Sequence, residues 1–196
     1  MSITAAAPTL SQAPFWYLTR STGIVAFVLL TVAMAFGIAA TQRALASPVW
    51  PRFATQNLHR NVSMLGLAFL VVHIITTIVD GFVTISWWNQ VIPFLSDYKT
   101  FWVGLGTVAS DLVLLLILSS LLRLKLSAKV WRTLHFTAYA LWPLSWLHFV
   151  NTGTDSAHGR FGIWVAIISA GVMGVSLAVR LVAGSNAPAP IRSIVR

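Results

Sequence analysis

The sequence predicts an all-α integral membrane protein, built as a bundle of five transmembrane helices. Of its 196 residues, 57% are hydrophobic and only 9% are charged, whereas charged residues make up about a quarter of a soluble globular domain. Spanning the hydrocarbon core of a bilayer takes about 20 apolar residues. Five segments reach that length, and their predicted ranges are 22–40, 58–79, 101–122, 130–150 and 161–183.

The basic residues predict how these helices are oriented. The loop before the second helix contains Arg43 and Arg52. The loop before the fourth helix is also basic, with Arg123, Lys125, Lys129 and Arg132. On the opposite side, basic residues are fewer and are balanced by acidic ones: Arg20, Lys99 and Arg160 against Asp80, Asp97 and Asp155. Because basic residues concentrate in cytoplasmic loops, the N-terminus is predicted outside and the C-terminus inside.

This orientation divides the chain into three parts. Residues 1–21 are expected to form an extracytoplasmic N-terminal segment, residues 22–183 the transmembrane domain, and residues 184–196 a disordered cytoplasmic tail. No signal peptide is evident, because the first twelve residues carry no basic segment. The expected location is the cytoplasmic membrane, also called the inner membrane. The net charge of +9 then reflects membrane topology, and no nucleic-acid partner is expected.

Four histidines in the apolar segments are the main functional signal. His59 and His73 are fourteen residues apart in the second predicted helix, and His135 and His148 are thirteen apart in the fourth. Histidine is costly inside a membrane, so such residues point to function. Both helices run from inside to outside, which places one member of each pair about 20 Å further out than the other. The depths therefore match across the two helices.

Matched depths predict two b-type haems, one above the other. One imidazole from each helix can ligate one iron, giving an inner site on His59 and His135 and an outer site on His73 and His148. The absence of cysteine excludes iron–sulfur clusters, thiolate-ligated haem and covalent c-type attachment. A dinuclear zinc or copper site lacks the carboxylate or thiolate ligands it would need. The fifth histidine, His158, is interpreted as an ordinary loop residue.

Helix rotation fits the first interval better than the second. Fourteen residues return to within about 40° of the starting direction, so the midpoint residue Gly66 shares a face with the two histidines and leaves room for a macrocycle or a close helix. Thirteen residues leave the rings about 140° apart. Pro143 lies between them and is expected to kink the helix so that both rings face the interior. Trp142 is a candidate to stand between the two haems.

Charged residues near the histidines suggest supporting roles. Arg60 and Arg132 are adjacent in sequence to the inner pair, and Arg20 and Arg160 are outer candidates, for binding haem propionates. Each can equally be a topology determinant or a lipid-headgroup contact. Asp111 lies in the middle of the third predicted helix, where a carboxylate is costly. It is interpreted either as a proton relay or histidine-orienting group, or as a protonated residue facing a polar pocket.

The histidine segments resemble the ferric reductase-like transmembrane domain of ferric reductases and NADPH oxidases. The matching segments run from Leu58-His59-Arg60 through His73, and from Trp131-Arg132-Thr133-Leu134-His135 through His148. Intervals of fourteen and thirteen are that family's pattern, and Trp16, Arg20 and Gly23 extend the likeness to the first helix. The resemblance implies that the four histidines are the axial ligands of two stacked haems.

Two departures from the family narrow the expected function. The family usually has six helices, and its best-known enzymes continue into a domain that binds FAD and NADPH. Here only a short tail follows the last helix, and no Gly-x-Gly-x-x-Gly follows a strand. The chain is similar to stand-alone bacterial members, such as the haem-binding subunit of the periplasmic methionine sulfoxide reductase system.

The resemblance implies that the chain is the membrane subunit of an oxidoreductase. Electrons are expected to come from a cytoplasmic flavoprotein reductase, with its own flavin, or from a quinol. The expected acceptor is an extracytoplasmic redox protein or a ferric chelate. Bis-histidine ligation suits electron transfer better than oxygen binding. Two alternatives remain open: a self-sufficient reductase of ferric iron or oxygen at the outer haem, and a haem-free transporter or assembly factor.

Overall fold

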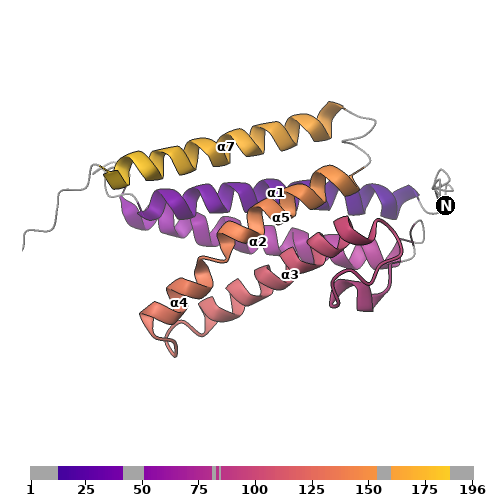
Figure 1. Cartoon of the computed structure of the whole chain (residues 1–196), viewed down its shortest axis with the longest axis horizontal. Coiled ribbons are helices and arrows are strands. Elements are labelled where there is room, and N and C mark those ends of the chain that lie inside the picture. The colour runs from indigo at the N-terminus through magenta and orange to yellow at the C-terminus, as the bar shows by residue number, and fades with distance from the viewer. Residues whose placement is uncertain (1–12, 42–50, 81–82, 84, 154–159, 186–196) are drawn as a thin grey trace, which may run out of the picture.

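A computed structural model describes residues 13–41, 51–80, 83, 85–153 and 160–185 of the chain. Within these ranges all regular structure is helical, as the predicted all-α fold requires. The elements are α1 (Ala13–Thr41), α2 (Arg52–Val79), the short 3-10 helix η2 (Trp87–Gln90), α3 (Thr100–Leu121), α4 (Ala128–His135), α5 (Ala138–Thr152) and α7 (Arg160–Ser185), shown in Figure 1. The residues predicted as a disordered tail lie almost entirely outside the described ranges.

Four of these helices are long and apolar enough to cross a membrane: α1, α2, α3 and α7. The first two begin earlier than the hydrophobic runs suggest. The helix α1 starts at Ala13, so residues 13–21 are helical. Pro14 is tolerated there because the first turn of a helix needs no backbone N–H donor. The helix α2 starts at Arg52, and four of its first six residues are polar: Arg52, Thr55, Gln56 and Asn57.

The expected fourth span, 130–150, is not one continuous helix. It is divided into α4 and α5 by a tight turn at Phe136 and Thr137, whose φ and ψ are −66° and −17°, and −62° and −17°. These angles are close to 3-10 geometry, and the N–H groups of Tyr139 and Ala140 donate to carbonyls three residues back at 3.0 Å. The interruption therefore lies before Pro143, which is inside α5.

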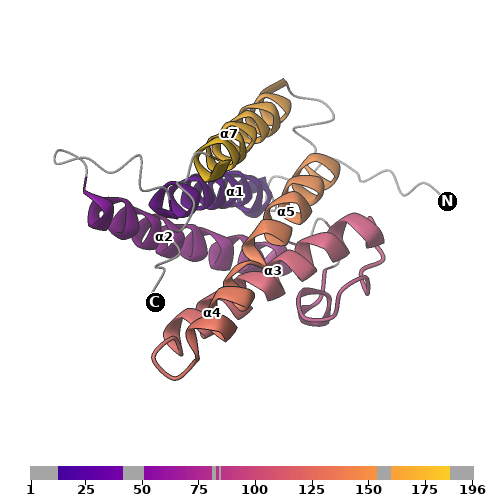
Figure 2. The ribbon, with the colours of Figure 1, turned by 60° about the vertical axis from the view of Figure 1, so that its left-hand side comes forward.

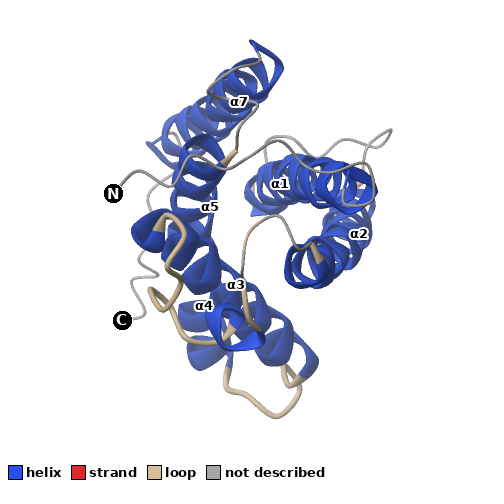
Figure 3. Cartoon of the chain, turned by 90° about the vertical axis from the view of Figure 1, so that its right-hand side faces the viewer, coloured by secondary structure: helices blue, strands red, loops and turns tan. Residues whose placement is uncertain are grey.

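The helices form two pairs that face each other. The helix α1 packs most extensively along α2, and α3 packs along α5 and α4. Contacts of α1 with α5 join the pairs, and α7 lies against α1 and α5 (Figures 1 and 2). Viewed along the bundle in Figure 3, α1 and α2 lie on one side and α3, α4 and α5 on the other.

Side chains from both pairs meet in one small core. Ala109, Val113 and Leu141 are buried there. Partly buried leucines and an isoleucine pack around them, from α2, α3 and α5: Leu67, Leu70, Leu112, Leu116, Ile117 and Leu144. Many large apolar side chains on the outer helix faces are exposed, among them Val175 and Leu181 of α7. Exposed apolar faces suit helices that are surrounded by lipid.

Candidate functional site

His59 of α2 lies beside His135 of α4. The ring centroids of His59 and His135 lie 6.2 Å apart, with an angle of 76° between the ring planes. A metal–imidazole bond is about 2.0 Å long, so two imidazoles facing one metal ion have their ring centroids about 6 Å apart. The spacing of this pair therefore fits two axial ligands of one iron.

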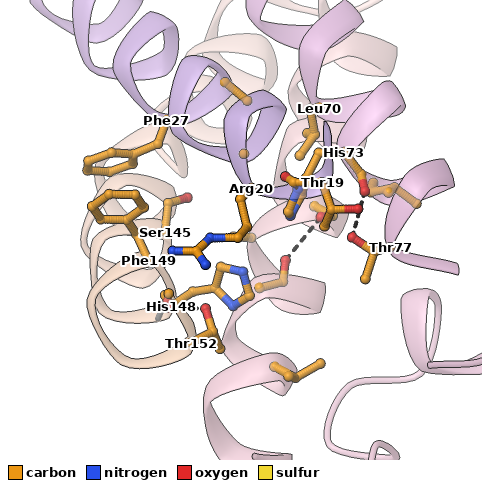
Figure 4. Close-up of a pocket in the computed structure, with 18 of the residues that line it drawn as sticks. Thr19, Arg20, Phe27, Leu70, His73, Thr77, Ser145, His148, Phe149 and Thr152 are labelled. Carbon is orange, nitrogen blue, oxygen red and sulfur yellow. Dashed lines mark hydrogen bonds between the residues drawn. The ribbon is translucent and has the colours of Figure 1, made fainter. Parts of the chain in front are cut away.

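His73 and His148 line a cavity between the two helix pairs (Figure 4). Its walls come from α1, α2, α3, α5 and the segment between α2 and α3. They are largely apolar, with Phe27 and Phe149 stacked at a centroid distance of 4.8 Å. Arg20 also points into this cavity, and its guanidinium carbon lies 4.0 Å from the centroid of a Trp16 ring. The buried carboxylate of Asp80 also lines the cavity. Two imidazoles and a guanidinium in a largely apolar cavity suit a flat apolar group that carries acidic substituents.

Backbone carbonyls hold three of the four imidazoles. The bonds run from Nδ1 to the oxygen of a neighbouring helix: His59 to Ala33 at 2.7 Å, His73 to Thr19 at 2.8 Å, and His148 to Trp102 at 2.8 Å. A carbonyl oxygen only accepts hydrogen bonds, so Nδ1 must carry the proton in each neutral ring. The other nitrogen, Nε2, then keeps its lone pair for a metal ion.

The fourth imidazole, that of His135, has a different environment. Its Nδ1 is buried and, within the described ranges, has no hydrogen-bond partner. The ring stacks on Trp131 at a centroid distance of 4.9 Å and an angle of 19°. The indole Nε1 of Trp131 is likewise buried without a partner in those ranges. Buried polar groups are nearly always bonded, so His135 differs in this respect from the three histidines whose Nδ1 bonds a carbonyl.

Each of the three bonded imidazoles also lies directly on a glycine. The pairs are Gly37 with His59, Gly23 with His73, and Gly106 with His148. A Cβ atom on Gly23 would lie 2.9 Å from Cε1 and Nδ1 of the ring, and a Cβ on Gly106 would lie only 2.5 Å from them. The same atom on Gly37 would lie 3.1 Å from the ring. The rings thus occupy space that any other residue would fill.

Sequence reasoning did not identify these glycines as site residues, although one signal was present. Gly23 and Gly37 are fourteen residues apart on α1, which is the interval between the two histidines on α2. Since α1 and α2 are packed side by side as consecutive helices, equal intervals place each glycine opposite one histidine. Gly23 entered only through the family resemblance.

Other predicted site residues lie away from the histidines or face different partners. Gly66 is buried against α1, where an added Cβ would lie 3.4 Å from Leu29 Cβ. It therefore permits a close helix and does not line the cavity. Trp142 donates from Nε1 to Thr31 Oγ1 at 3.0 Å and so ties α5 to α1. Asp111 is exposed on α3 and is not among the described residues that line the cavity.

The predicted arginines differ in their surroundings. Arg20 lines the cavity of His73 and His148, whereas Arg60 and Arg132 are exposed. Arg132 donates to the Ala128 carbonyl at 3.1 Å and lines a second hollow beside α4. The side chains of Arg160 and His158 lie outside the described part of the chain.

Among the described residues, no metal site is formed by protein side chains alone. In the ranges that the structure describes, no three histidine, cysteine or acidic side chains cluster in a way that could hold a metal ion. Two imidazoles facing each other are too few for a zinc or copper site. They are the usual complement for an iron whose other ligands come from a porphyrin. The residues present therefore fit haem.

Comparison with known proteins agrees with this chemistry. A family model described as "Ferric reductase like transmembrane component" matches residues 22–146. The match includes His59, His73 and His135 and ends two residues before His148. No curated protein and no solved structure gives a significant match. The chain is a multi-pass membrane protein that belongs to the ferric reductase-like transmembrane component family.

Proposed function

We propose that this chain carries electrons across a membrane through two b-type haems. His59 and His135 would hold one haem, and His73 and His148 the other. The observation that supports this most is the state of the imidazoles: three of them bond a backbone carbonyl through Nδ1, which leaves Nε2 free for iron. Haem b, when bound, supplies a one-electron ferric–ferrous couple.

The chain itself orients the iron ligands, excludes water from them and supplies positive charge for the haem substituents. The carbonyl bonds fix the orientation of His59, His73 and His148 before any cofactor binds, which reduces the ordering cost of binding. The apolar walls around the cavity exclude water from the ligands. Arg20 is placed to pair with an anionic substituent of the haem held by His73 and His148, while Arg60 and Arg132 are proposed for the other site.

The proposed topology has α4 and α5 together as a fifth span. Ala128 to Thr152 is a stretch of 25 residues that includes the two turn residues between α4 and α5. At 1.5 Å per residue it reaches at most about 37 Å, compared with a hydrocarbon thickness of about 30 Å. With the N-terminus outside the cytoplasmic membrane, the His59–His135 pair is the inner site and the His73–His148 pair is the outer site. Arg123, above the Trp131 ring at 4.5 Å, then lies on the cytoplasmic side.

The proposed donor is a cytoplasmic-side flavoprotein or a quinol, and the proposed acceptor is an extracytoplasmic redox protein or a ferric chelate. This direction places the inner site next to the donor and the outer site next to the acceptor. No nicotinamide-binding motif is recognisable in these 196 residues, so a separate partner is proposed to supply any flavin.

The function can be tested in sealed vesicles. The purified chain is reconstituted into liposomes that enclose ferricyanide, and dithionite is added outside. We expect the enclosed ferricyanide to be reduced much faster than in protein-free liposomes, and liposomes with the His73→Ala variant to lose this activity. Ferricyanide that stays oxidised, although the chain retains its haems, would contradict transmembrane electron transfer.

A further inference from the structure

The three carbonyls that accept the imidazole bonds share one feature of position. Each belongs to the residue four places before the glycine on which the same ring lies. The sets are Thr19, Gly23 and His73; Ala33, Gly37 and His59; and Trp102, Gly106 and His148. The arrangement recurs on two helices, α1 and α3, and serves histidines of both proposed haem sites.

Helix geometry explains why glycine is needed at that position. The carbonyl of residue i−4 already accepts the N–H of residue i and has a second lone pair. Side chains on a helix lean toward its N-terminus, so the side chain at i covers this oxygen. Thr31 shows the effect in this chain, since its hydroxyl reaches back to the Phe27 carbonyl at 3.0 Å. A glycine at i leaves the oxygen open to a ring from another helix.

We propose that Gly23, Gly37 and Gly106 are positioning residues that set the orientation and basicity of the haem-ligating imidazoles. Each glycine opens one backbone carbonyl, and the bond from Nδ1 to that carbonyl increases electron donation from Nε2. This inference rests on the proposed function, because the rings matter in this way only if they ligate iron. It adds that residues with no contact to the metal tune each site separately.

The two proposed haem sites differ in how many of their imidazoles bond a backbone carbonyl. His73 and His148 are both held by a carbonyl, whereas only His59 of the other pair is. The histidines of α4 and α5 are thirteen residues apart, and the residue thirteen places after Gly106 on α3 is Ser119. It is buried, and its hydroxyl donates to Leu116 O at 3.0 Å. No glycine occupies the matching place, and His135 is the ring whose Nδ1 has no partner in the described ranges.

Alanine substitutions in the full-length chain test the proposal. Gly106→Ala places a Cβ 2.5 Å from its ring, Gly23→Ala places one at 2.9 Å, and Gly37→Ala at 3.1 Å. The disturbance should decrease in that order. Gly171→Ala is the matched control, because a Cβ there meets nothing within 4 Å and the change also adds one methyl group to a membrane helix.

The readouts are the haem content and the midpoint potential of each haem, from a redox titration of the b-type absorbance. A less basic ligand stabilises ferric iron less, so the potential should rise. Loss of such an outer hydrogen bond typically changes metal affinity about 10-fold to 100-fold. If ferric iron loses about tenfold more affinity than ferrous iron, the potential rises by about 59 mV. Gly23→Ala and Gly106→Ala should raise the potential of one haem, and Gly37→Ala that of the other.

The possible results distinguish a failure of this inference from a failure of the proposed function. Wild-type protein with two haems, together with glycine variants whose potentials all match Gly171→Ala, would overturn the inference alone. Wild-type protein without haem would overturn both. A variant that misfolds would lose both haems, so the mild Gly37→Ala substitution is decisive: it must shift one haem and leave the other unchanged, or the inference is wrong.

Discussion

Replacing Trp142 by phenylalanine should weaken the contact between α5 and α1. The indole donates to Thr31 Oγ1 at 3.0 Å, and Thr31 is only 3% exposed. Hydrogen bonds between membrane helices contribute about 0.6 kcal/mol on average and at most about 1.7 kcal/mol. Because the Thr31 side chain is almost fully buried, we expect a coupling energy in the upper part of that range, about 1 to 1.7 kcal/mol.

A double-mutant cycle measures this coupling. The variants are Trp142→Phe, Thr31→Val and the double change, and the free energy of unfolding is followed by loss of helix in mixed micelles of increasing SDS content. Independent sites show coupling of only about 0.3 to 0.5 kcal/mol. A coupling no larger than that would refute the idea that this bond helps to hold the two helix pairs together around the cavity.

Three further predictions concern the haem sites. His73→Ala should reduce the haem content from two per chain to one and leave the spectrum of the remaining haem unchanged. His59→Ala should remove the other haem. Loss of both haems in either variant would argue against separate sites. The planes of the His59 and His135 rings are 76° apart, so the ferric form of that haem should give a highly anisotropic low-spin electron paramagnetic resonance signal, and a signal typical of parallel rings would contradict this near-perpendicular orientation. Arg20→Leu removes a cation that disfavours ferric iron. It should therefore lower the midpoint potential of the haem held by His73 and His148 and leave the potential of the other haem unchanged. Equal shifts at both haems would contradict the placement of Arg20.

The membrane fold was largely predictable because hydrophobicity and length decide which segments can span. Four predicted spans correspond to long apolar helices. Their starts were less predictable, because a helix can begin before the apolar run, as α2 does at Arg52, six residues before the predicted span. The turn at Phe136 and Thr137 contains no glycine or proline, so no local signal marked it. The prediction considered only Pro143, which lies inside α5.

The pairing of the histidines was predictable for a different reason. Depth in a membrane follows directly from residue count in a helix, so His59 could be matched with His135 from topology alone. The partners of Nδ1 could not be predicted, because a backbone carbonyl has no signature of its own in the sequence. The glycine four residues after that carbonyl does have a signature in the sequence, because the interval from Gly23 to Gly37 equals the interval between the two histidines of α2. Gly66 also lies at a close helix contact but faces no ligand.

The most direct test is the number of haems bound by the purified full-length chain. Haem is quantified by the pyridine haemochrome method against protein measured by amino-acid analysis, on a sample whose reduced spectrum is recorded first. We predict two non-covalent b-type haems per chain, because two pairs of imidazoles are arranged for them. One haem per chain would contradict the two-site arrangement, and a chain with no haem absorbance would contradict the proposed electron transfer altogether.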